Sequence, residues 1–323
     1  KREGKIMANI REYNMNGTLI LGIDHGYGNI KTAHRVFPTA LIKSEKAPTF
    51  SKDYLEYDGY FYIIGEGHKS FIAEKQSDDD NYILTLAAIA KELNARELTS
   101  ARVHLAAGLP LKWVQAQRES FRQYLMQNKI VQFRYKGRQY EVEIAGCTVM
   151  PQCYSAVAEN LKDFKGMNLL ADIGNGTMNI MYLNNGRAME SKSWTEKLGV
   201  FQCMQRIRNK VLDETGTNLM NEVIENYLRT GETDIAEPYA SLMKEAAVSY
   251  VQEIFQKLKD YEYNESLKQL HFMGGGARIV EAVGEYNRER THFNHDICAT
   301  AKGYEYYCYM ILRHSQIPKR RGI

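Results

Sequence analysis

The stretch "LILGIDHGYGNIK", residues 19–31, decides the fold of this chain. An apolar run ends abruptly at Asp24, and two glycines follow at alternate positions, Gly26 and Gly28, before Asn29 and Lys31. The pattern predicts a buried strand, a tight turn and a second strand, with an acid at the end of the first. A plain strand hairpin would account for the glycines. It would not account for the acid, nor for the lysine seven residues after it.

The same pattern returns in the second half of the chain. There, "NLLADIGNGTMNI", residues 168–180, ends an apolar run at Asp172 and continues with Gly174, Gly176 and Thr177. Each copy then runs into a further strand-like segment. Internal repeats of this kind indicate two related structural units.

Two such turns have a specific chemical use. Glycines let backbone N–H groups approach an anion closely, as in other turns that bind phosphate. The two acids would repel phosphate, but they suit a hydrated Mg²⁺, which prefers oxygen ligands and keeps part of its water. The repeat therefore predicts two hairpins that hold a polyphosphate, with the metal at Asp24 and Asp172.

Size and composition agree with a two-domain globular protein. The chain has 323 residues, against roughly 150 per domain, and 44% are hydrophobic. A net charge of +3 is too small to indicate nucleic-acid binding by charge alone. The cysteines form no zinc or disulfide pattern, and no apolar run is long enough to span a membrane. We expect a cytoplasmic protein with a polar N-terminal extension over residues 1–17. The five cysteines are Cys147, Cys153, Cys203, Cys298 and Cys308.

A third glycine cluster lies in "HFMGGGARIV", residues 271–280. Gly274, Gly275 and Gly276 follow an apolar strand and precede a helix, and three glycines in a row carry an entropic cost of about 0.5–1 kcal/mol each. The turn is expected to lie against a flat or phosphorylated ligand, with Arg278 beside it. The alternative is a tight strand-to-helix connection. Gly199, which precedes another predicted helix, is a further candidate for nucleotide contact.

In this order, the three glycine segments resemble those of the actin superfamily of ATPases. The resemblance covers residues 18–314 and includes two connecting segments, "VMPQCYSAVAE" (149–159) and "ATAKGYEYY" (299–307). It implies an α/β fold in which two ribonuclease-H-like domains flank a nucleotide cleft. The first domain would comprise residues 18–163 and 299–323, and the second residues 164–298.

Within the superfamily, the chain looks most like the plasmid-segregation actins of the ParM (StbA) type. The resemblance implies that ATP or ADP is bound with Mg²⁺, and GTP stays open as an alternative. Asp24 would hold the metal through water and Lys31 would reach the β and γ phosphates. Asp172 would orient or polarise the attacking water, and Gln152 would position it. Plasmid actins commonly carry glutamate at the position of Gln152, and a glutamine can orient a water but cannot take its proton.

The leading functional hypothesis is therefore an ATPase that assembles head to tail into filaments and disassembles after hydrolysis. A DNA-bound adaptor protein would then be the partner, so that DNA is contacted indirectly and no membrane is involved. A small-molecule kinase on the same fold is the alternative, although "VMPQCYSA" offers no carboxylate to act as its base. A chaperone-like nucleotide-gated protein is a third hypothesis. An iron–sulfur activator is disfavoured because cysteine ligand pairs are missing.

Overall fold

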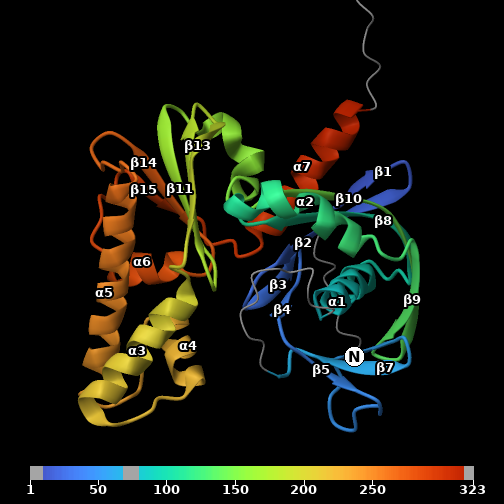
Figure 1. Ribbon diagram of the computed structural model, residues 1–323, viewed down its shortest axis with the longest axis horizontal. Coiled ribbons are helices and arrows are strands. Elements are labelled where there is room, and N and C mark those ends of the chain that lie inside the picture. Colours follow the sequence, from blue (N-terminus) through green and yellow to red (C-terminus); the bar gives the residue numbers. More distant parts are fainter. Residues whose placement is uncertain (1–9, 68–79, 316–323) are drawn as a thin grey trace, which may run out of the picture. The chain divides into compact units, whose positions relative to one another are not determined.

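The computed structural model describes residues 10–67 and 80–315, which divide into two compact units (Figure 1). Within these residues, unit 1 comprises 10–67, 80–109, 113–151 and 298–315, and unit 2 comprises 110–112 and 152–297. Each unit is built on a mixed β-sheet with helices packed against it. The α/β architecture predicted from the sequence is confirmed. None of the helices in the described ranges is long and apolar enough to cross a membrane.

The sheet of unit 1 has ten strands in the order β4–β3–β2–β8–β10–β9–β6–β7–β5, and β1 pairs with β2. The central strands β2, β8 and β10 run parallel, and the remaining neighbours are antiparallel. The strands are β1 (Tyr13–Met15), β2 (Thr18–His25), β3 (Asn29–Thr32), β4 (Val36–Pro38), β5 (Leu41–Ser44), β6 (Tyr54–Tyr57), β7 (Tyr60–Ile64), β8 (Ser100–Leu109), β9 (Ile130–Tyr135) and β10 (Arg138–Pro151).

Side-chain alternation along β2 divides unit 1 into two layers, because successive residues of a strand point to opposite faces. Leu21 and Ile23 belong to the large core that includes helices α1 (Asp80–Ala95) and α2 (Leu111–Leu125). Ile20 packs on the other face, against helix α7 (Ala299–Ser315). Helix α7 approaches so closely that a Cβ on Gly22 would lie 2.0 Å from the Ala301 carbonyl oxygen. Gly22 is therefore required for this packing.

The sheet of unit 2 has five strands in the order β13–β12–β11–β14–β15. Strands β11, β14 and β15 are parallel, whereas β12 is antiparallel to both β11 and β13. The strands are β11 (Met167–Ile173), β12 (Met178–Asn184), β13 (Arg187–Glu196), β14 (Gln269–Met273) and β15 (Thr291–Phe293). The hairpins predicted around the two repeats are thus both present, as β2–β3 and β11–β12.

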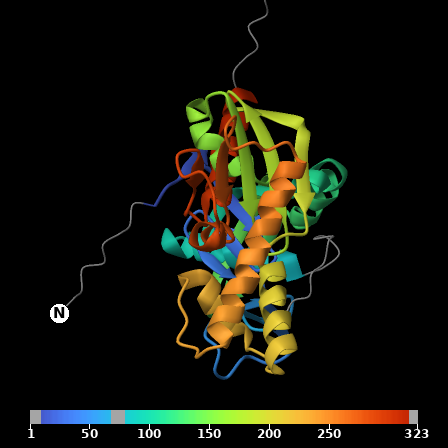
Figure 2. The same ribbon diagram turned by 90° about the vertical axis from the view of Figure 1, so that its left-hand side faces the viewer.

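Helices cover both faces of this second sheet. One face packs against α3 (Val200–Thr215), α4 (Asn221–Thr230), α5 (Tyr239–Asp260) and α6 (Ala277–Val283), and Figures 1 and 2 show α3 and α5 side by side. On the opposite face, Leu170 and Met181 pack against the 3-10 helix η2 (Ser155–Asp163). Asp172 lies two residues beyond Leu170 on β11, so its side chain is on the face that η2 covers.

Candidate functional site

In the first repeat, the acid and the lysine are partners across two strands. Asp24 on β2 lies directly opposite Lys31 on β3, and Lys31 Nζ is 3.4 Å from Asp24 Oδ2. The carboxylate is 6% exposed and the lysine side chain 18% exposed. A charge so close to full burial is costly without a counter-charge, and the lysine provides it. The seven-residue spacing of the sequence therefore reflects the register of one hairpin.

The glycine turn between these strands is held by a residue that lies further along the chain. Thr39 Oγ1 donates to the Gly26 carbonyl at 2.7 Å, and the Thr39 amide donates to the Gly28 carbonyl at 3.0 Å. Gly26 itself cannot be replaced without strain, because a Cβ there would lie 2.5 Å from the Asn29 carbonyl oxygen. The turn is thus fixed in shape, with Asn29 exposed at the start of β3.

In the second repeat, the turn is bound to the start of α3. The amides of Val200 and Phe201 donate to the carbonyls of Gly174 and Asn175, at 3.0 and 2.9 Å. A Cβ on Gly199 would lie 2.3 Å from the Asn175 carbonyl oxygen, so only glycine allows this approach. The Gln202 side chain caps the helix by accepting from the Gly199 amide at 2.8 Å.

The triple glycine packs against Asp172 and Ile173, the two residues that precede this turn. The Gly276 amide donates to the Ile173 carbonyl at 3.0 Å. Gly274 has φ +79°, and a Cβ there would lie 2.6 Å from Asp172 Oδ1. The structure therefore brings Asp172, the 174–177 turn, Gly199 and the triple glycine together within unit 2.

This packing leaves amide groups available for an anion. The Gly174 amide donates to the Thr177 carbonyl, and α3 occupies the carbonyls of Gly174 and Asn175. Within the described part of the chain, the amides of Asn175 and Gly176 have no protein acceptor. Successive free N–H groups in a turn are a common phosphate-binding arrangement.

Gln152 follows β10 directly, lies just before η2 and contacts the sheet of its own unit, unit 2. The Asn179 side-chain amide donates to Gln152 Oε1 at 3.5 Å. The next residue, Cys153, has φ +70°, a left-handed conformation that is uncommon for residues other than glycine. Burial raises the pKa of the Cys153 thiol well above its usual value, and the charge of Asp172 raises it further. The buried position and the raised pKa both disfavour the reactive thiolate form.

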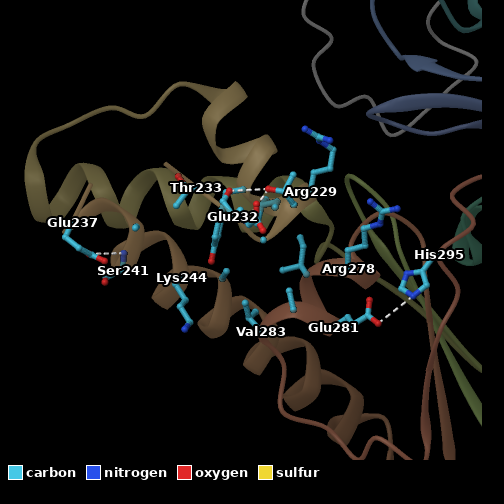
Figure 3. Close-up of a pocket in the computed structure, with 18 residues that line it drawn as sticks. Arg229, Glu232, Thr233, Glu237, Ser241, Lys244, Arg278, Glu281, Val283 and His295 are labelled. Carbon is cyan, nitrogen blue, oxygen red and sulfur yellow. Dashed lines mark hydrogen bonds and ion pairs between the residues drawn. The ribbon is translucent and has the colours of Figure 1, made fainter. Parts of the chain in front are cut away.

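Arg278 lines a pocket of 1080 Å³ formed by α4, α5 and α6 (Figure 3). Figure 3 shows Arg229 of α4 and Arg278 of α6 pointing to the same side of it. Glu281 pairs with His295 across 3.6 Å, and the Ser241 amide donates to Glu237 at 3.3 Å. Among the described residues, Arg278 has no acidic partner. A guanidinium in this setting can stack on an aromatic ring or meet a negative charge.

Each unit offers one buried carboxylate as a candidate metal ligand. Asp24 and Asp172 are each under a tenth exposed, and both are carboxylates, the ligand type that Mg²⁺ prefers. No group of three or more histidine, cysteine or acidic residues suited to a metal occurs within residues 10–67 and 80–315. This chemistry fits a metal that keeps most of its water and is shared with phosphate oxygens.

Several residues of the site were not identified from the sequence. Thr39, Asn179 and Arg229 carry no local signal, because their roles depend on contacts with distant segments. Gln202 could have been found, since a glutamine three residues after a helix cap is a known capping pattern. The catalytic and nucleotide-binding roles predicted for Asp24, Lys31, Gln152, Asp172 and the glycines stay predictions.

Comparison with known proteins agrees with this architecture. Residues 22–154 match the family model "Actin like proteins N terminal domain", and residues 170–284 match "Archaeal actin homologue MreB-like, C-terminal". No curated protein is recognisably similar in sequence. The chain belongs to the actin superfamily, as the glycine segments predicted.

Solved structures show the same fold at low identity. The archaeal actin homologue Ta0583 superposes with a TM-score of 0.75 and 16% identity, over 90% of this chain and 99% of that one. The Alp12 filament structure gives 0.67 and 17%, over 92% and 100%. ParM from Bacillus thuringiensis with AMPPNP gives 0.66 and 12%, also over 92% and 100%. The fold of this chain is therefore the two-domain actin-like fold.

Proposed function

We propose that this protein is an actin-like ATPase that assembles into nucleotide-dependent filaments and serves in plasmid DNA segregation. The observation that carries the proposal is the turn at residues 174–177, which is assembled from three glycine segments and ends with unoccupied amides beside Asp172. Such a turn suits the phosphates of a nucleotide. The structural relatives include a ParM bound to AMPPNP and an Alp12 filament, which supports nucleotide binding and self-assembly.

The roles proposed for the residues are those that the chemistry of each side chain allows. The glycine turn of each unit would serve the phosphates of ATP, Asp24 would hold Mg²⁺ through water, and Asp172 is the second candidate ligand for the metal. Lys31 would reach the β and γ phosphates. Arg278 and its pocket accept the base, and Gly275 lies against the nucleotide because a Cβ there would meet no protein atom within 4 Å. Phosphoryl transfer then depends on positioning and charge rather than on covalent catalysis.

Asp172 is the residue to test first. Replacing Asp172 with alanine should abolish phosphate release and leave nucleotide binding largely intact, because the acid acts on the attacking water or on the metal. Phosphate release and the affinity for a fluorescent ATP analogue would be measured with Mg²⁺. Asp213→Ala on the exposed face of α3 is the matched control. Full turnover in Asp172→Ala would remove Asp172 from the catalytic role.

Assembly is tested by light scattering in the same samples. Scattering that rises above a critical concentration with Mg²⁺ and ATP, and decays as phosphate appears, would support a dynamic filament. A DNA-bound adaptor protein is the proposed cellular partner and would be sought by co-sedimentation with the filament. Flat scattering, with turnover only after small-molecule acceptors are added, would favour the kinase instead. Repeating the assay with GTP would decide the nucleotide.

A further inference from the structure

A row of three polar side chains crosses the sheet of unit 2. Asp172 on β11 lies opposite Asn179 on β12, which in turn lies opposite Thr195 on β13. Side chains of directly opposed residues share a face of the sheet. Met181, two residues beyond Asn179, packs against η2 on that face. The polar row therefore occupies the same face as Gln152, which immediately precedes η2.

A chain of two hydrogen bonds leads from Thr195 through Asn179 to Gln152. Thr195 Oγ1 donates to Asn179 Oδ1 at 2.9 Å, and Asn179 Nδ2 donates to Gln152 Oε1 at 3.5 Å. In this arrangement the oxygen of Asn179 faces Thr195 and its NH₂ group faces Gln152. Asn179 is only 3% exposed, so water competes little for these contacts.

The second bond lies at the long end of the hydrogen-bond range, which is common at catalytic groups in ligand-free proteins and shortens when substrate binds. The backbone beside Gln152 is also held in an unusual form, the left-handed conformation of Cys153. Such local strain persists only where the surroundings enforce it, and it clusters at functional sites. Both observations point to Gln152 as a side chain whose direction is controlled.

The direction matters because the two ends of a glutamine amide are chemically different. Its oxygen has two lone pairs and can accept more than one proton. When it accepts a proton of a water, a lone pair of that water is left to attack. The reversed amide would present N–H groups and bind the attacking lone pair instead. A carboxylate would need no such control, because its two oxygens are equivalent.

We infer that Asn179 and Thr195 are positioning residues, which set the amide of Gln152 so that its oxygen receives the attacking water. The inference rests on the proposed function, since it assigns a regulator to the water-positioning glutamine of that site. It also explains why two polar side chains lie on a face where Leu170 and Met181 are apolar.

Thr195→Val tests this with little change in shape. We expect kcat for phosphate release to fall roughly fivefold, because one hydrogen bond contributes about that factor. KM and nucleotide affinity should stay unchanged. Thr195→Ser keeps the hydroxyl and should restore kcat. The control is Thr217→Val, which removes a half-buried hydroxyl bonded to Tyr239 at 3.2 Å in the same unit. Asn179→Asp should lower kcat further, because a carboxylate would attract the NH₂ end of Gln152 and reverse the amide.

The decisive comparison repeats Thr195→Val in a Gln152→Glu background. There the fivefold effect should vanish, since the orientation of a symmetric carboxylate does not matter. An equal fall in both backgrounds, or an unchanged kcat in the Gln152 background, would overturn the inference and leave Thr195 a structural residue.

A second readout needs no activity. The side-chain amide signals of Gln152 in a nitrogen-15 NMR spectrum, assigned by their loss in Gln152→Glu, should shift in Thr195→Val and not in Thr195→Ser or Thr217→Val. Unshifted signals would refute the orientation of the amide. Absence of hydrolysis in the unmodified protein would instead refute the proposed function, so the two failures are distinguishable.

Discussion

Glu305 in helix α7 is expected to make the stability of unit 1 depend on pH around neutrality. Its side chain is 1% exposed, and Oε1 accepts the Gly22 amide of β2 at 3.1 Å. Within the described part of the chain, Oε2 has no hydrogen-bond partner. The pKa of Glu305 is raised from 4.5 to about 8, chiefly by burial and in smaller part by the charge of Glu92. The Gly22 amide, Arg11 and Arg96 oppose that rise.

The sign follows from proton binding. Between pH 4.5 and 8 the folded protein keeps the proton of Glu305 and the unfolded chain has lost it. The free energy of unfolding therefore falls as pH rises, by about 1.4 kcal/mol per pH unit and about 5 kcal/mol over the whole window. Glu305→Gln retains an acceptor for Gly22 and cannot ionise. Over the two units from pH 5.5 to 7.5, the wild type should lose about 3 kcal/mol relative to this variant.

Urea unfolding followed by circular dichroism at pH 5.5, 6.5 and 7.5 would measure this difference. Comparing the two proteins cancels the contributions that other titrating groups make to the free energy of unfolding. His104 and His271 are the main ones, because burial lowers the pKa of each to about 4. Their contribution to stability therefore rises with pH below 6.5. Glu119→Gln, at a side chain that is 64% exposed, is the control and should run parallel to the wild type. If the difference in free energy of unfolding between Glu305→Gln and the wild type is the same at all three pH values, Glu305 does not titrate in this range.

Two further changes probe the glycine turns. Gly276→Ala would place a Cβ 2.2 Å from Ile173 Cγ2 and should destabilise unit 2 by about 1–3 kcal/mol in thermal unfolding. Gly275→Ala meets no protein atom and should leave stability unchanged while it weakens nucleotide binding; equal effects of the two variants on stability would contradict the packing. Thr39→Val removes the bond to Gly26 and should weaken ATP binding about fivefold by calorimetry, with Thr217→Val as the control. Unchanged affinity in Thr39→Val would mean that the first turn keeps its shape without the hydrogen bond from Thr39.

Local features were predictable from the sequence because they depend on neighbours in the chain. The turn of each repeat, the strand before it and the position of Asp24 and Asp172 at the strand ends follow from apolar runs interrupted by glycine. The partnership of Asp24 with Lys31 is also local, since a short hairpin sets their register. These features, with the order of the three glycine segments, were enough to predict the superfamily.

Contacts between distant segments could not be predicted in the same way. Gly22 reads as an ordinary strand glycine, yet it is required by helix α7, nearly the whole chain away. Thr39 and Thr195 are common polar residues with no motif around them, and Asn179 lies beyond the acid and glycines that mark the second repeat. Their hydrogen bonds exist only because the folded sheet sets their register against Gly26 and Gln152.

The sequence by itself thus determined where the glycine turns lie and which acids stand beside them, because glycine and aspartate act through their own backbone and charge. Tertiary structure alone decided the shape in which those turns are held and the direction in which Gln152 points. It also decided that Glu305 is buried and that its pKa is raised. The physical reason is that a side chain's partners, solvent exposure and pKa are set by atoms that lie close in space, and the chain brings those atoms together only when it folds.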